Sequence, residues 1–155
     1  MLDHPVHDEQ LADDMRALRT LDLFAGLPDA ELLAFAARCT ITTAHPGQVV
    51  QAQGVPVRMW HVITGGHAVV QRSGRAIGLL GRGQSWSEHS LLNDHPSSIA
   101  VVALSPLTLC TLSRRAFFGI PETHPVLAGR LVARSAHSAD RLAPPVSAAL
   151  RPARV

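Results

Sequence analysis

The sequence predicts a mainly β protein with flanking helices, built as an antiparallel β-roll of the jelly-roll type between N-terminal and C-terminal helices. Two observations carry this prediction. Apolar residues at helical spacing are confined to the two ends of the chain, and the middle holds short β-branched runs separated by glycines. With 155 residues, of which 46% are hydrophobic, the chain has the size of one domain that buries a core without disulfide or metal support.

The N-terminal segment, residues 1–20, is predicted to form an acidic helix. Its apolar residues at helical spacing are Leu11, Met15 and Leu18. A second helix is predicted from Pro28 through Ala36, because proline is favoured at a helix start and two acidic residues follow it in the first turn.

The middle of the chain is predicted to form seven strands. They are Ile41–Ala44, Val49–Gln51, Met59–Thr64, His67–Arg72, Ile77–Leu80, Ile99–Ala103 and Leu107–Leu112. Glycines between the runs supply the positive φ that tight turns need. Residues 64–67 (Thr-Gly-Gly-His) and 72–75 (Arg-Ser-Gly-Arg) are the clearest predicted hairpins.

The C-terminal part is predicted to be helical again. Ser113 caps a short helix over Arg114–Gly119, and a longer helix starts around Pro125 and continues to Leu142. Residues 143–155 are rich in Ala, Pro and Arg, and this composition is typical of a flexible tail.

Charge is spread unevenly along the chain. Residues 1–31 hold eight acids and two arginines, whereas residues 32–155 hold twelve arginines and four acids. Two interpretations stay open: both ends are simply solvated, or the arginine-rich part meets an acidic partner or nucleic acid. No basic run and no interleaved aromatics support nucleic-acid binding.

Several classes of protein are disfavoured. The longest apolar stretch, Ile99–Leu112, is interrupted by Ser105 and Pro106 and is shorter than the ~20 residues of a membrane span. The acidic first twenty residues are unlike a secretory signal, so we expect a cytoplasmic protein. Cys39 and Cys110 lie in apolar contexts, which predicts free thiols.

The most informative segment is residues 83–100, which is predicted to place one short helical turn inside the β structure. Ser85 and Glu88 have the spacing of a capping box, and Ser87 adds a hydroxyl at the helix start. Such a position is suited to an anion. In the alternative interpretation these groups only cap their own helix.

Four segments together resemble the cyclic nucleotide-binding domain family, which includes bacterial catabolite activator regulators and regulatory subunits of cyclic-nucleotide-dependent kinases. They are residues 23–27 (Leu-Phe-Ala-Gly-Leu), 46–54, 59–66 and 83–100, with landmarks at Gly47, Gly54, Gly66 and Gly83. The resemblance spans residues 21–142 and implies a β-roll domain there, between the acidic segment and the tail.

The family's phosphate-binding cassette, matched to residues 83–100, implies a set of candidate ligand-binding residues: Trp86, Ser87, Glu88, His89, Pro96, Ser97 and Ser98. The resemblance puts Glu88 where a carboxylate accepts the ribose 2′-hydroxyl of cyclic AMP or cyclic GMP. Ser87 stands at the family's Gly, and Ser97 stands where the family's Arg pairs with the cyclic phosphate.

The loss of that Arg predicts weak cyclic nucleotide binding. A charge-assisted hydrogen bond contributes about 1.5–3 kcal/mol, so its absence corresponds to about ten- to a hundred-fold in affinity or more. Arg75 and Arg82 are near in sequence, but each replaces the charge only if its loop folds back toward the cassette.

Other chemistry has little support. The nine histidines form no zinc spacing, and we expect surface or capping roles for them, with His61 or His67 as a haem ligand left open. His89 and His95 lie around the cassette and would make its pocket sensitive to pH. No nucleophile elbow or acid/base pair is present, so we expect no enzymatic activity and no metal site.

The resemblance also leads to expectations about output. No DNA-reading module follows the last predicted helix, so we expect no direct DNA binding but a protein partner, and a homodimer formed through residues 125–142. Two functions stay open: a regulatory domain that senses a cyclic nucleotide or a related ligand, or an adaptor module that kept the fold and lost ligand binding.

Overall fold

The computed structural model describes residues 4–135, with side chains described over residues 9–134. The helices, including the 3-10 helix η1, are α1 (His4–Arg19), η1 (Asp22–Phe24), α2 (Asp29–Arg38), α3 (Glu88–Leu92), α4 (Arg114–Phe118), α5 (Ile120–Thr123) and α6 (Pro125–Ser135). The strands are β1 (Thr40–Ala44), β2 (Val49–Gln51), β3 (Met59–Gly65), β4 (Ala68–Arg72), β5 (Arg75–Leu80), β6 (Ser85–Trp86), β7 (Ala100–Ala103) and β8 (Leu107–Ser113).

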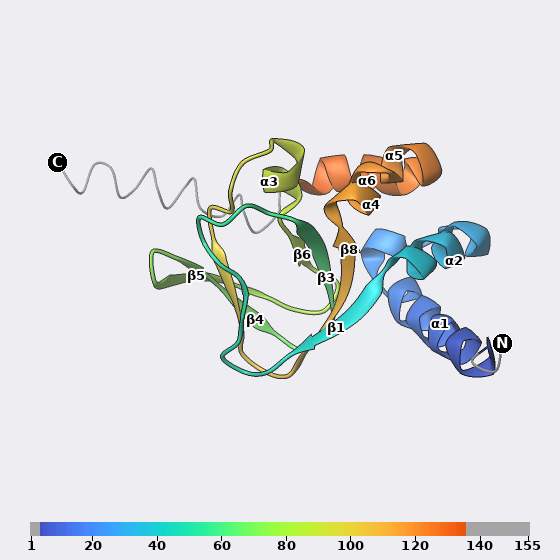
Figure 1. Ribbon diagram of the computed structural model, residues 1–155, viewed down its shortest axis with the longest axis horizontal. Helices are drawn as coiled ribbons and strands as arrows, with labels where there is room; N and C mark the ends of the chain where they lie inside the picture. The colour runs from blue at the N-terminus through green and yellow to red at the C-terminus, as the bar shows by residue number, and fades with distance from the viewer. Residues whose placement is uncertain (1–3, 136–155) are drawn as a thin grey trace.

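The eight strands form two four-stranded antiparallel sheets that face each other as a roll (Figure 1). One sheet has the order β1-β8-β3-β6, and the other has the order β2-β7-β4-β5. The helices α1, α2, α4, α5 and α6 gather beside the first sheet, away from the β4–β5 hairpin. The predicted fold class, an antiparallel roll with flanking helices, is confirmed.

The first sheet separates two cores, because side chains alternate between the faces of a strand. Trp60 and Val62 of β3 face the helices, where they join a core made mostly by helical residues. Ile63 of the same strand faces inward and packs in the roll with residues of both sheets. The helices and the roll are therefore joined through one shared layer.

All seven predicted strands are present, and the two predicted hairpins have different outcomes. Residues 72–75 connect β4 to β5, which pair directly, and Ser73 and Gly74 at the turn have positive φ (52° and 80°). Residues 64–67 do not form a hairpin, because β3 and β4 belong to different sheets. This turn carries the chain from one sheet to the other.

Gly66 shows why glycine is needed at that crossing. Its φ is 88°, and a Cβ placed there would lie 2.2 Å from the carbonyl oxygen of Pro106. The two chain segments approach so closely that neither the conformation nor the space accepts a side chain.

The helical predictions hold in outline. Ser113 caps α4, as predicted, and its Oγ accepts a hydrogen bond of 3.1 Å from the backbone N–H of Ala116. The short helices η1 and α5 were not predicted. The last helix is described from Pro125 to Ser135, and its predicted continuation to Leu142 and the predicted tail 143–155 lie outside the described residues.

The two cysteines are free thiols, as predicted. The fold places Cys110 beside Cys39. Burial and the neighbouring Cys110 thiol both raise the pKa of the Cys39 thiol. A thiol held protonated in this way is a poor nucleophile. Over the described part of the chain, no helix combines the length and the apolar character that crossing a membrane requires.

Candidate functional site

The candidate site is the cassette, residues 83–100, which runs through β6 and α3 and then leads into β7. The predicted capping box is wrong. Ser85 lies in β6, paired with Val62 of β3, and α3 begins only at Glu88 with no side-chain cap. Strand pairing with β3 takes up the residues that the sequence pattern assigned to a helix start.

Ser87 has the backbone conformation that explains the family's glycine at this position. Its φ is 82° and ψ is −5°, which is left-handed and disfavoured for residues with a Cβ. The residue is completely buried, and its Oγ has no hydrogen-bond partner within the described structure. Ser87 therefore adopts a conformation that glycine, the residue the resemblance implies here, accepts more readily.

Glu88 is also completely buried. Its Oε2 accepts a hydrogen bond of 2.5 Å from the indole Nε1 of Trp60, which lies on the helix-facing side of β3. Trp60 in turn packs at ring-centroid distances of 5.6 Å from Phe117 and 6.2 Å from Phe35. The carboxylate that the resemblance assigns to a ribose hydroxyl is thus bonded to the aromatic core under the helices.

Ser97, which the resemblance puts at the family's phosphate-binding Arg, uses its hydroxyl within its own loop. The Oγ donates a hydrogen bond of 2.7 Å to the carbonyl of Ile99 and accepts one of 3.3 Å from the Ile99 N–H. The backbone N–H of Ser97 donates to the Val55 carbonyl at 3.0 Å. With 2% of its surface exposed, the side chain offers an anion neither charge nor a free donor.

No nearby arginine replaces the missing charge among the described contacts. The guanidinium of Arg82 bonds the hydroxyl of Thr20, and Arg75 lies exposed at the β4–β5 hairpin. Arg114 forms an ion pair of 3.0 Å with Asp94, at the end of the cassette that faces α4. Neither Arg75 nor Arg82 forms a hydrogen bond with Ser97 in the part of the chain that the structure describes.

The remaining predicted site residues are dispersed. Pro96 is exposed, Ser98 and His89 are half-buried, and the His89 ring contacts the exposed His95 at 5.2 Å. Trp86 is completely buried inside the roll, and its indole Nε1 has no partner there. The structure thus gathers Trp86, Ser87 and Glu88 in the interior and leaves the others along the loop.

The sequence did not reveal a polar group on the inner face of the first sheet. The Nδ1 of His61 lies 2.9 Å from the Thr111 Oγ1, which lies 3.1 Å from the Thr42 Oγ1. The His61 ring stacks on Trp86 with centroids 4.9 Å apart and an interplanar angle of 26°. Burial lowers the pKa of His61 to about 4, so the imidazole is neutral at physiological pH.

Metal chemistry receives no support from side-chain grouping. Within the part of the chain that the structure describes, no three His, Cys, Asp or Glu side chains gather closely enough to hold a metal ion. His67, the second histidine considered for haem, is exposed in the turn between β3 and β4.

A roll of two antiparallel sheets that carries a strand–turn–helix cassette and a helical layer defines the class of cyclic nucleotide-binding domains. The family model described as "Cyclic nucleotide-binding domain" matches residues 41–124. The chain belongs to this family.

Known relatives agree with this assignment. A regulatory subunit of a cAMP-independent protein kinase A from Trypanosoma brucei has 18% identity and a TM-score of 0.74, over 86% of this chain and 48% of its own. A cAMP-binding acyltransferase from Mycobacterium smegmatis, in a mutant form, has 29% identity and a TM-score of 0.66, over 81% and 40%. A cGMP-dependent protein kinase from Eimeria tenella is 23% identical over 103 residues, which are 66% of this chain.

The chain spans less than half of each of these relatives: 48% and 40% of the two solved structures, and 10% of the Eimeria kinase. A triple mutant of the Trypanosoma protein, one of whose substitutions is Thr to Arg, is described as bound to cAMP in its A site.

The buried bond between Trp60 and Glu88 predicts unequal effects of two Trp-to-Phe substitutions. We expect Trp60→Phe to lower the free energy of unfolding by about 1.5–3 kcal/mol more than Trp86→Phe, because only Trp60 donates to a carboxylate. Both residues are fully buried, so the loss of packing is matched. Urea denaturation of both variants measures the difference, and equal losses would contradict the assignment.

Burial of His61 predicts a pH dependence of stability. The unfolded chain takes up a proton near pH 6.5, whereas the folded protein resists it until about pH 4, so stability is lost as the pH falls between these values. The expected loss is about 3 kcal/mol. His61→Gln flattens this part of the profile, while the exposed His67→Gln retains it. Parallel profiles for wild type and His61→Gln would refute the prediction.

Proposed function

We propose that this chain is a non-enzymatic, cytoplasmic regulatory domain that no longer depends on cyclic nucleotide at its cassette and that acts on a protein partner. The observation that carries the proposal is Ser97. It stands at the position of the phosphate-binding Arg, is buried, and has its hydroxyl bonded to the Ile99 peptide.

A cyclic phosphate carries a full negative charge that must exchange water for protein groups when it binds. Without a cation, a buried anion is held only by neutral donors, which are about half as strong. The Glu88 carboxylate is engaged by Trp60. The side chain that the family uses for the phosphate is therefore replaced, and one oxygen of the carboxylate assigned to the ribose already accepts a hydrogen bond.

The Trypanosoma relative supports this proposal. It is described as cAMP-independent, and its triple mutant with a Thr-to-Arg substitution is described as bound to cAMP. A domain of this fold thus occurs in a regulatory protein without cAMP dependence.

A second function, sensing of a polar ligand at the cassette, is favoured by a different observation. Three consecutive residues, Ser85, Trp86 and Ser87, each have a buried side-chain polar atom without a hydrogen-bond partner in the described structure. Such atoms are rare in proteins and call for a ligand or an ordered water. Cyclic AMP and cyclic GMP are the candidates that the family and its cAMP-binding acyltransferase relative offer.

The output of the domain is proposed to run through its last helix, with a homodimer formed by residues 125–142. On the described part of this helix, Val126 and Val132 are 50% and 64% exposed, and Val132 lines an apolar groove with Leu92 and Phe118. Exposed apolar surface of this kind is typical of an interface. Light scattering at tens of micromolar is expected to give the dimer mass, and a monomer mass would overturn this point.

The proposal is tested by restoring the missing charge. We expect the wild-type protein to show no saturable change in Trp fluorescence with cyclic AMP or cyclic GMP below about 1 mM. Ser97→Arg is expected to bind at least about ten-fold more tightly, since it supplies the charge-assisted contact. The neighbouring Ser98→Arg serves as the matched control and is expected to behave as wild type.

Micromolar binding by the wild-type protein would refute the proposal and establish the sensing function instead. Absence of binding by Ser97→Arg, with its fold verified by circular dichroism, would mean that Ser87 and Glu88 also prevent a nucleotide from entering.

A further inference from the structure

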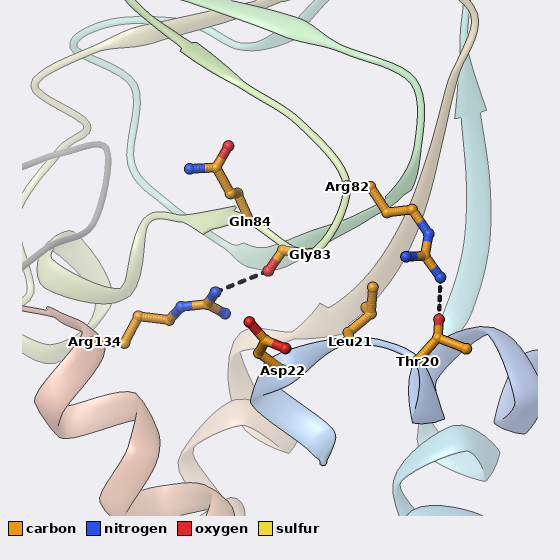
Figure 2. A pocket seen from close by; sticks show the side chains of 7 residues that line it. All are labelled: Thr20, Leu21, Asp22, Arg82, Gly83, Gln84 and Arg134. Carbon is orange, nitrogen blue, oxygen red and sulfur yellow. Dashed lines mark hydrogen bonds between the residues drawn. The ribbon is translucent and has the colours of Figure 1, made fainter.

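A polar pocket of about 240 Å³ lies at the start of the cassette, where three separate parts of the chain meet (Figure 2). Its walls come from the segment that joins α1 to η1, from the turn between β5 and β6, and from α6. The lining residues are Thr20, Leu21, Asp22, Arg82, Gly83, Gln84 and Arg134.

Arg134 of α6 has an incomplete set of partners in this pocket. Its Nη2 donates a hydrogen bond of 2.8 Å to the carbonyl of Gly83, and its Nη1 is buried with no partner in the described structure. A buried N–H of a cation without an acceptor is costly, and such groups in native proteins indicate a bound molecule. The Nη1 donor is therefore left without an acceptor in the described structure.

The charge in the pocket favours an anion. Neither Arg82 nor Arg134 belongs to the ion pairs formed by the described residues, and Arg82 bonds only the Thr20 hydroxyl. The two guanidiniums outweigh the one carboxylate, that of Asp22, by a single positive charge. Figure 2 shows Asp22 and Arg134 directed into the same part of the pocket, with Arg82 on the other side of Gly83.

The turn between β5 and β6, which carries the lining residues Arg82, Gly83 and Gln84, is held by hydrogen bonds before any ligand arrives. The Gln84 Oε1 accepts a hydrogen bond of 2.7 Å from the Gly81 N–H. The Gly83 N–H donates to the Ile63 carbonyl at 2.7 Å, and Gly83 adopts a φ of 87° that suits glycine. A ligand does not have to order this wall of the pocket, which lowers the cost of binding.

We propose that this pocket binds a small metabolite through one oxyanion group, a carboxylate or a phosphoryl group. Arg134 holds the oxyanion, Arg82 on the other side of Gly83 adds positive charge to the pocket, and Asp22 accepts a hydrogen bond from a hydroxyl or amine on the same ligand. Guanidinium is the side chain best matched to both kinds of oxyanion.

The position of the pocket gives binding a regulatory consequence. The same ligand contacts α6 and the turn that directly precedes β6, at the start of the cassette. A second contact of α6, from Arg130 Nη1 to the Leu23 carbonyl at 2.8 Å, already holds the helix against η1. An anion bound by Arg134 stabilises this docked arrangement of α6 over any other.

Calorimetric titration of the full chain with acetate, glycolate and inorganic phosphate, at an ionic strength fixed with sodium chloride, tests the proposal. We expect saturable binding at one site. Glycolate is expected to bind more tightly than acetate, because its hydroxyl reaches Asp22, and Asp22→Asn is expected to remove this preference. The phosphate arm shows whether the natural group is phosphoryl or carboxylate.

Arg134→Gln is expected to weaken binding about ten-fold, since it removes a charge-assisted contact, and Arg82→Gln, which removes a charge on the other side of Gly83, is expected to weaken it less. Arg134→Lys keeps the charge and serves as the control that separates loss of the charge from loss of folding in Arg134→Gln. Arg75→Gln on the exposed hairpin is expected to leave binding unchanged. Absence of saturable heat with all three anions, or equal weakening by Arg75→Gln, would overturn the proposal whatever the cassette binds.

Discussion

The arrangement of this domain depends on one buried hydrogen bond, from the Trp60 indole to the Glu88 carboxylate. Taking a carboxylate out of water is unfavourable unless strong hydrogen bonds replace the lost solvation. Trp60 stands in the layer that separates the roll from the helices, so the bond fixes the start of α3 to that layer. Everything that follows Glu88 in the cassette, including the loop to Ser97, is positioned relative to this point.

The same bond links the cassette to helices that precede the roll and to helices that follow it. Trp60 packs against Phe35 of α2 and Phe117 of α4, and α6 covers the same core with Leu127 and Leu131. A carboxylate that moved toward a ligand would have to break its contact in this core. The Oε2 of Glu88 therefore serves the position of the helices, so any ligand that bonds this carboxylate is coupled to the core under them.

Periodicity predicted most of the fold, because the strands are short, β-branched and bounded by glycines. It missed β6, whose two residues are too few to show an alternation, and it assigned Ser85 to a helix cap. It also took residues 64–67 for a hairpin, since a sequence does not show which strands pair. The site was predicted by motif, but the bond to Trp60 and the stack of His61 on Trp86 are long-range contacts that no local pattern contains.

The polar pocket also depends on long-range contacts that a local pattern does not contain. Its walls lie far apart in the sequence and meet only when α6 docks. The turn at Gly83 and Gln84 is common to both sites: one residue later the chain enters β6, and on its other side Arg134 bonds the Gly83 carbonyl. A shift of α6 would remove that bond and change the support of the turn. In the arrangement that we propose, an anion in the polar pocket acts on the same helix that covers the core behind the cassette.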